Sequence, residues 1–319
     1  MSLWQKLMKF VSPNSKEEPV PNPVGLPVEN KDEPVEAREA PLTGEGGHRM
    51  EGGLDLEICL QTDPGLVRTN NEDRCVCKRP AGPAGGKGTL VIVADGMGGA
   101  EAGEVASEMA ITLIPEAYYD SPKAPALALK EAVERASAQI HRTAQADPGL
   151  RGMGTTCVAM AVVLPELFVA YVGDSRLYLL RGNALYQLTE DHTVVFEMVR
   201  KGLLTREQAR RHEERNVLSL SMGGRPEITA SYWENPMIAR AGDRLLVCSD
   251  GLHDLLTEGE IQAIIADSPA HEAVANLIAA AKRNGGHDNI TVALVHVFVR
   301  TAPLDAASRH TREFTMPSQ

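Results

Sequence analysis

The sequence TLVIVADGMGG at residues 89–99 ends a run of five apolar residues with Asp95 and a group of glycines. Three further segments resemble it, because Asp174 and Asp250 follow apolar runs and Asp288 precedes one. A single Asp-Gly at a strand end is a common turn. Four such ends in one domain constrain the fold more strongly, since converging carboxylates repel one another unless cations lie between them.

The chemistry of these residues predicts a site for divalent cations. Carboxylate oxygens favour Mg²⁺ or Mn²⁺, and Gly96 has no side chain that would keep an ion from its backbone carbonyl. The alternative for the same stretch is a dinucleotide-binding loop. Residues 96–101 read GMGGAE, however, and lack the last glycine of G-x-G-x-x-G. An aspartate directly before the loop would also repel a pyrophosphate.

The order of apolar and turn segments predicts an α+β fold. Apolar or alternating runs predict strands at 54–61, 74–79, 89–94, 155–163, 167–173, 176–181, 228–233, 244–249 and 290–298. Helices are predicted at 100–118, 123–146, 192–202, 205–212, 257–266 and 269–284, and two of them start with capping-box sequences at Thr205 and Thr257. Because strands and helices cluster separately, a layered fold with hairpins is favoured over a doubly wound parallel sheet.

Charge and cysteine content limit the classes of function. The 319 residues carry a net charge of −11, which argues against a nucleic-acid partner, because phosphate backbones require a basic surface. No apolar run approaches the roughly 18 residues of a transmembrane segment, and no secretory signal is visible. The five cysteines lack the spacing of a zinc site. They are predicted to be reduced core residues of a cytoplasmic protein.

Composition divides the chain into three parts. Residues 1–53 are expected to be disordered, since 11–53 hold seven of the 20 prolines and many glutamates. The first 11 residues have apolar side chains at helical spacing. They fit a short amphipathic helix that touches a membrane surface or a partner, with a frayed terminus as the alternative. Residues 54–299 form the predicted catalytic domain, and 300–319 a flexible tail.

A set of motifs then occurs in a fixed order along the domain. They are RTNNEDR at 68–74, VADGMGG at 93–99, MGTT at 153–156, VGDSRLY at 172–178, LTEDHT at 188–193, GDRLLVCSDGLHDLL at 242–256 and GGHDNITV at 285–292. Together they resemble the bacterial branch of the protein phosphatase 2C family, the metal-dependent serine/threonine phosphatases. The resemblance covers about 54–299. It implies a four-layer αββα sandwich, in which two mainly antiparallel sheets are flanked by helix pairs and metals lie at one end.

The resemblance also implies a role for each motif carboxylate. Asp95 would bridge two Mn²⁺ or Mg²⁺ ions, and Gly96 would offer its carbonyl. The remaining implied metal-site residues are Asp250 and Asp288 on the same two ions, Asp174 with Asp250 on a third ion, and Glu72 and Asp73 on metal-bound waters or a metal.

The implied reaction is hydrolysis of phosphoserine and phosphothreonine by hydroxide held between two metal ions, with Asp95 and Arg68 as catalytic residues. Arg68 would bind the phosphate, since arginine can hold two phosphate oxygens at once; an ion pair with Glu72 is the alternative. Expected partners are phosphoproteins, including a serine/threonine kinase, and the protein is expected to be a monomer. The alternative functions are an inactive phosphatase-fold scaffold or sensor, and a phosphoesterase acting on small molecules.

The segment 193–226 corresponds in the resemblance to a mobile flap. Its arginines Arg206, Arg210, Arg211 and Arg215 are either a grip for an acidic phosphoprotein or a solvated helix face paired with neighbouring glutamates. Met97 cannot protonate a leaving group. Histidines stand beside the motif aspartates at 192, 253 and 287. A solvent-exposed ring, or one that contacts the metal-site residues and not the metals, is favoured there over a role in proton transfer or orientation.

Deletion of residues 1–53 is predicted to leave hydrolysis of a small aryl phosphate nearly unchanged, because this segment contains none of the motif residues and its composition predicts no packing against the domain. The measurement is kcat/KM for the truncated and the full-length chain. Loss of turnover in a truncated chain that still folds would place the N-terminal segment inside the catalytic domain.

Overall fold

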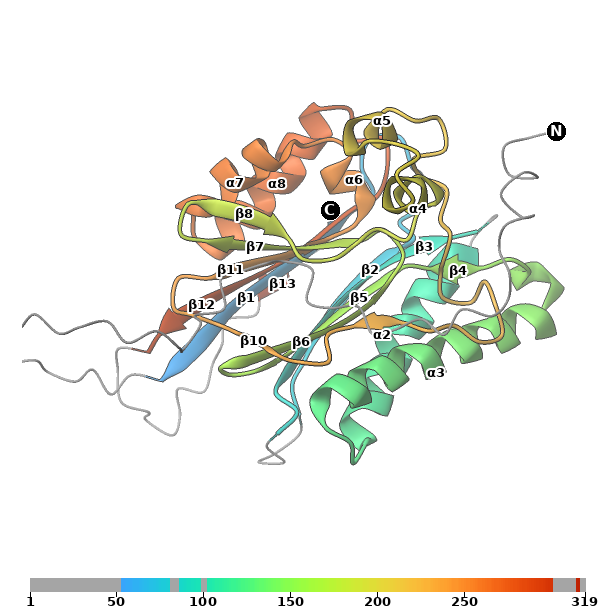
Figure 1. The fold of residues 1–319 in the computed structure, drawn as a ribbon, viewed down its shortest axis with the longest axis horizontal. Helices are drawn as coiled ribbons and strands as arrows, with labels where there is room; N and C mark the ends of the chain where they lie inside the picture. Colours follow the sequence, from blue (N-terminus) through green and yellow to red (C-terminus); the bar gives the residue numbers. More distant parts are fainter. Residues whose placement is uncertain (1–52, 81–85, 99–101, 301–313, 316–319) are drawn as a thin grey trace, which may run out of the picture.

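The computed structural model describes residues 53–80, 86–98, 102–300 and 314–315. Two packed β-sheets form its centre (Figure 1). The first sheet has the strand order β13-β1-β12-β11-β7-β8. Its strands are β1 (Leu54–Asp63), β7 (Arg176–Arg181), β8 (Ala184–Gln187), β11 (Arg244–Cys248), β12 (Ile290–Val299) and β13 (Phe314–Thr315).

The second sheet follows the order β10-β6-β5-β3-β2, with β4 paired to β3 and β9 to β6. Its strands are β2 (Asp73–Lys78), β3 (Thr89–Met97), β4 (Gly154–Thr155), β5 (Cys157–Val163), β6 (Glu166–Val172), β9 (Ser231–Tyr232) and β10 (Met237–Ile238). Every strand pair of the two sheets is antiparallel except β1 with β13.

Helices cover both outer faces of the sandwich (Figure 1). Helices α2 and α3 pack on the second sheet, and α7 and α8 on the first. The helices are α2 (Ala102–Asp120), α3 (Pro125–Ala146), the 3₁₀ turn η1 (Pro148–Leu150), α4 (Val194–Arg200), α5 (Arg206–Arg210), α6 (Asp250–His253), α7 (Glu258–Ala266) and α8 (Ala270–Arg283). The predicted four-layer αββα sandwich is confirmed.

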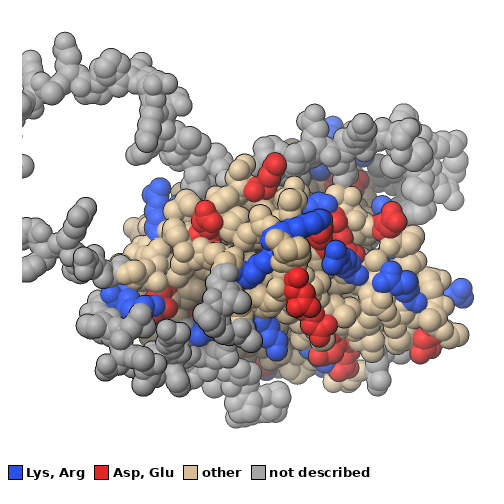
Figure 2. Space-filling model, turned by 90° about the horizontal axis from the view of Figure 1, so that it is seen from below, with Lys and Arg blue, Asp and Glu red and all other residues tan. Residues whose placement is uncertain are grey.

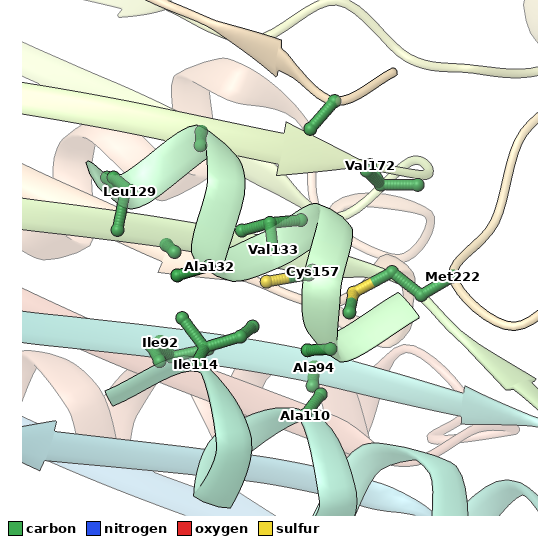
Figure 3. Close-up of a cluster of buried hydrophobic side chains, with 14 of the residues drawn as sticks. Ile92, Ala94, Ala110, Ile114, Leu129, Ala132, Val133, Cys157, Val172 and Met222 are labelled. Atoms are coloured by element: carbon green, nitrogen blue, oxygen red, sulfur yellow. The ribbon is translucent and has the colours of Figure 1, made fainter. Parts of the chain in front are cut away.

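Strand β3 shows why its sequence is continuously apolar. Leu90 and Ile92 point to the core between the second sheet and its helices, shown in Figure 3, whereas Val91 and Val93 point to the core between the two sheets. All four side chains are fully buried. A strand covered on both faces needs apolar residues at every position, and not at alternate ones.

Most predicted elements are present, with differences at their ends. The predicted end of a strand at Asp95 is wrong, because β3 continues to Met97 by pairing with β2 and β4. The predicted strand 228–233 shrinks to β9, since only two residues pair with β6. Strands β8 and β10 and helix α6 were not predicted. Both capping boxes, at Thr205 and Thr257, are confirmed.

Charges of both signs are interspersed on the face shown in Figure 2. In the described part of the chain, no helix is both long and apolar enough to cross a membrane. No disulfide joins any of the five cysteines, all of which are among the described residues, and Cys59, Cys157 and Cys248 are buried. The predicted N-terminal segment and C-terminal tail lie outside the described residues, except for Gly53, Arg300 and β13.

A close approach of α2 to β3 explains one of the glycines. A Cβ atom on Gly96 would lie 2.2 Å from the carbonyl oxygen of Gly103 and 2.5 Å from that of Glu72. Both obstacles are backbone atoms, so neither can turn aside. Gly96 is therefore required for packing of the helix on the strand, in addition to any role towards a ligand.

Replacement of Gly96 by Ala is predicted to lower the free energy of unfolding by about 3 kcal/mol or more, because backbone must shift to admit the methyl group. The matched control is Gly259→Ala in α7, where a Cβ would meet nothing within 4 Å. That change is expected to raise stability by about 0.5–1 kcal/mol. Equal effects of the two changes in urea denaturation would contradict the packing argument.

Candidate active site

The strand registers bring the motif carboxylates to one end of the sandwich. In the first sheet, Asp63 is opposite Ile290 and Cys248 is opposite Val292, so the loops before β12 and after β11 meet there. In the second sheet, Asp73 is directly opposite Asp95. Five of the predicted site residues therefore lie at or next to this end, namely Glu72, Asp73, Asp95, Asp250 and Asp288.

Ser249 joins the two sheets at this end. Its hydroxyl donates to Asp73 Oδ2 at 2.7 Å and accepts from the Thr291 backbone N–H at 3.0 Å. Asp73 and Ser249 are both fully buried. This contact fixes the start of β2 against the end of β11, directly before Asp250.

Two threonines of the MGTT motif hold Asp95 in place. The Asp95 backbone N–H donates to Thr156 Oγ1 at 3.0 Å, and the Thr155 hydroxyl donates to the Asp95 carbonyl at 2.9 Å. Thr156 Oγ1 also lies 2.7 Å from Ser175 Oγ. Since Ser175 follows Asp174 directly, the same threonine connects the Asp95 strand to the loop after β6.

Asp174 and Asp250 are brought together by His253. The side chain of His253 is 4% exposed, and its Nε2 lies 3.1 Å from the Asp174 carbonyl oxygen, to which it donates. Because His253 belongs to α6, whose first residue is Asp250, this bond joins the two carboxylate segments. The buried ring of His253 therefore supports the backbone of both carboxylate segments.

Asn289 organises the loop that carries Arg68. Its side-chain NH₂ group donates to the carbonyls of Pro64 at 3.1 Å and Asn70 at 2.9 Å, and its Oδ1 accepts from the Glu72 N–H at 2.8 Å. One buried amide thus closes both ends of the loop between β1 and β2.

Arg68 pairs with Asp288 and not with Glu72. Its Nη2 donates to Asp288 Oδ2 at 2.8 Å, with the Arg68 side chain 53% exposed and that of Asp288 29% exposed. The hydrogen bond to Asp288 raises the pKa of Arg68 above its ordinary value. The arginine is therefore a charged, accessible group at the edge of the carboxylate cluster.

The carboxylates repel one another strongly. Loss of hydration, followed by the charges of Asp73 and Asp250, raises the pKa of Asp95 well above its ordinary value. The pKa of Asp250 is raised in the same way, first by burial and then by the charges of Asp174 and Asp288. Burial raises the pKa of Asp73 and of Asp174 to about 6. Such mutual perturbation is typical of functional sites.

The donor set fits divalent cations. Asp73 Oδ1 is buried and has no hydrogen-bond partner, and oxygen ligands with excess negative charge are what Mg²⁺ and Mn²⁺ prefer. Among the described side chains, no three of His, Cys, Asp and Glu could hold an ion as they are now oriented. Asp288, for example, points to Arg68. Side-chain rotation about the fixed backbone positions would be needed to enclose an ion.

The segment 193–226 borders this end of the sandwich. Thr155 and Met222 exchange two backbone hydrogen bonds, and Asn216 Nδ2 donates to Asp254 at 3.3 Å. Of its arginines, Arg211 directly follows α5 and pairs with Glu207 of that helix, whereas Arg210 pairs with Glu258 of α7. Two of the four arginines are therefore paired with glutamates, which favours the alternative of a paired helix face over a grip for an acidic phosphoprotein.

His192, which directly precedes this segment, connects the loop after β6 to β9 through its ring nitrogens. Its Nδ1 accepts from the Gly173 N–H at 3.1 Å, and its Nε2 lies 3.0 Å from Ser231 Oγ. Burial lowers the pKa of His192 to about 4, so the ring is neutral near pH 7.

The fold and this end of the sandwich define a two-sheet protein with a candidate metal centre between its layers. Residues 68–292 match the family model described as Protein phosphatase 2C. The chain therefore belongs to the protein phosphatase 2C family, as the order of its motifs predicts.

Individual relatives agree with this assignment. The chain is 39% identical over 245 residues to Protein phosphatase PhpP of Streptococcus pneumoniae, with 75% of this chain and 97% of that protein covered. It resembles the crystal structure of the serine/threonine phosphatase PstP/Ppp of Mycobacterium tuberculosis with a TM-score of 0.68 and 36% identity, over 76% of this chain and 98% of that one. A structure of the PstP catalytic domain in complex with two manganese ions gives a TM-score of 0.67 at 36% identity, over 77% and 99%.

The raised pKa of Asp73 predicts a pH-dependent stability of the protein in excess chelator. A carboxyl with a folded-state pKa of about 6 favours folding fully below the unfolded-state pKa near 3.8, and this contribution is lost as the pH rises through 6. Asp73→Asn removes the ionisation but keeps the shape. The variant is expected to gain about 2–3 kcal/mol relative to wild type between pH 4 and pH 7.

The measurement is urea denaturation of both proteins at several pH values. A stability difference that does not change with pH would contradict a raised pKa at Asp73.

Proposed function

We propose that this chain is a serine/threonine phosphoprotein phosphatase that depends on Mn²⁺ or Mg²⁺. The observation that carries the proposal is the group of carboxylates at one end of a phosphatase 2C sandwich. Burial and neighbouring aspartates raise the pKa values of Asp95 and Asp250 there, and the accessible Arg68 stands at the edge. The names of the relatives support the same reaction and substrate class.

The metal-site residues are proposed from their positions. Asp95 lies opposite Asp73 in the second sheet and would bridge two ions, with the Gly96 carbonyl beside it. The other proposed residues are Asp250 and Asp288 for the same two ions, Asp174 for a third, and Glu72 and Asp73 in direct contact or through water. When bound, the cations lower the pKa of water and neutralise charge on the phosphate.

Arg68 is proposed to bind the substrate phosphate. Its guanidinium is exposed and held by a single partner, Asp288, so it can turn to two phosphate oxygens. The Asn289 amide fixes the loop from which Arg68 projects. Met97 has no proton to donate to the leaving alkoxide, and no other described side chain is assigned this role.

The remaining proposals concern the location, the partners and the domain boundaries of the protein. We infer a cytoplasmic monomer that acts on phosphoproteins, including a serine/threonine kinase, without nucleic-acid partners. Residues 54–299 would suffice for catalysis, with 1–53 as a flexible appendage and 193–226 as a flap. The expectation of a flexible tail over 300–319 does not hold at Phe314–Thr315, which pair with β1. An inactive scaffold or sensor is disfavoured, because loss of activity commonly follows loss of metal ligands and all the predicted aspartates are present.

Activity on a phosphothreonine peptide is predicted to require Mn²⁺ or Mg²⁺ and to disappear after exhaustive chelation. Asp95→Asn is expected to reduce kcat by roughly two or more orders of magnitude, because one ligand serves both ions. The fold should persist, as circular dichroism can verify. Full activity of the chelated wild type, or of Asp95→Asn, would refute the proposal.

Arg68→Ala is predicted to lower kcat/KM for an aryl phosphate at least about tenfold, since a charge-assisted hydrogen bond contributes roughly 1.5–3 kcal/mol. Manganese affinity should hardly change. Arg79→Ala is the matched control, because Arg79 is an exposed arginine just beyond the far end of β2. Wild-type kinetics in Arg68→Ala would place the phosphate elsewhere.

A further inference from the structure

Two large apolar side chains directly precede Arg68 on the surface. Leu66 is 62% exposed and Val67 is 67% exposed. Single exposed apolar residues are ordinary in folded proteins. These two are adjacent in sequence and continuous with the arginine proposed to bind phosphate, and such a position is informative.

The loop that displays them is held in a defined conformation. Gly65 has φ +80° and donates its N–H to Asp63 Oδ1 at 2.8 Å. The Leu66 N–H donates to the Gly286 carbonyl at 2.7 Å. With the Asn289 amide closing the loop, the backbone beneath both side chains is fixed. A fixed apolar surface can bind a ligand with little further loss of conformational entropy.

Two ion pairs within the protein occupy the charged side chains at Asp63 and Arg68, next to this loop. Lys282 Nζ donates to Asp63 Oδ2 at 2.9 Å, and Arg68 is paired with Asp288. The residues Leu66 and Val67 therefore offer apolar contact and not a charge to a partner that lies over them.

A bound phosphoprotein must pass close to this surface. Consecutive Cα atoms are 3.8 Å apart, so the residues that flank a phosphoserine or phosphothreonine lie near whatever surrounds the phosphate-binding group. We propose that Leu66 and Val67 form an apolar docking surface for a side chain adjacent to the phosphorylated residue. The protein then prefers phosphopeptides with an apolar residue in that position. This inference rests on the proposed function.

The test compares two phosphothreonine peptides that differ only in the residues flanking phosphothreonine, leucine in one and serine in the other. The quantity is the ratio of kcat/KM for the two peptides, measured with manganese present. The wild type is expected to favour the leucine peptide about tenfold, as burial of one such side chain allows. The Leu66→Asn/Val67→Thr double variant should lower this ratio to about two or less.

Val67→Thr alone keeps the side-chain shape and, because Val67 is largely exposed, does not disturb packing; it should lower the ratio by about threefold. Ile238→Thr is the matched control. Ile238 is 50% exposed and pairs with Glu166 at the start of β6, whereas Asp174 lies beyond the end of that strand. The Ile238→Thr variant should therefore show the same ratio of kcat/KM for the two peptides as the wild type.

A wild-type ratio near one, or a ratio unchanged in both the double variant and Val67→Thr, would overturn the docking surface while leaving the proposed function intact. Failure of the wild type to hydrolyse either peptide would overturn the proposed function, and the docking surface with it.

Discussion

The main constraint on this structure is the repulsion among the carboxylates that the two sheets hold at one end. Asp73 and Asp95 face each other across a pair of adjacent strands, and Asp250 and Asp174 add to the charge around them. Their raised pKa values measure the cost of this arrangement. A fold that keeps such residues together without a ligand gives up stability, and bound divalent cations would remove the cost. The contacts of Thr155, Thr156 and Asn289 fix the backbone around the carboxylates, and Asp73 Oδ1 has no hydrogen-bond partner.

These supporting contacts come from residues far apart in the sequence. Ser249 reaches Asp73 across 176 positions, and Asn289 reaches Pro64 across 225. Thr155 and Thr156 hold Asp95 from about 60 positions away. The contact of Ser249 with Asp73 connects the two sheets, and the others explain why the MGTT and HDNIT segments accompany the aspartates.

The sequence predicts the local features well, because they depend on local physics. The continuous apolar run of β3 indicates a strand buried on both faces, and Thr257 with Glu260 indicates a helix start. The carboxylates and Arg68 are recognisable from their motifs. The end of β3 was misplaced because Asp95 is followed by glycines, whereas pairing with β2 and β4 continues the strand. The roles of Ser249, Asn289 and His253 could not be predicted from the sequence, since each depends on a partner that only the tertiary structure brings near. Asn289 could have been suspected from its place directly after a motif aspartate.

The central claim is that this carboxylate cluster is a binding site for divalent cations, and calorimetric titration with Mn²⁺ tests it most directly. Because the pKa values of Asp73 and Asp174 are raised to about 6 and those of Asp95 and Asp250 well above their ordinary values, binding must expel protons. Titration at pH 6 in two buffers of different ionisation enthalpy should show at least two bound ions and net proton release, which declines as the pH is raised. Absence of binding at millimolar Mn²⁺, or binding with no proton release at pH 6, would contradict the account.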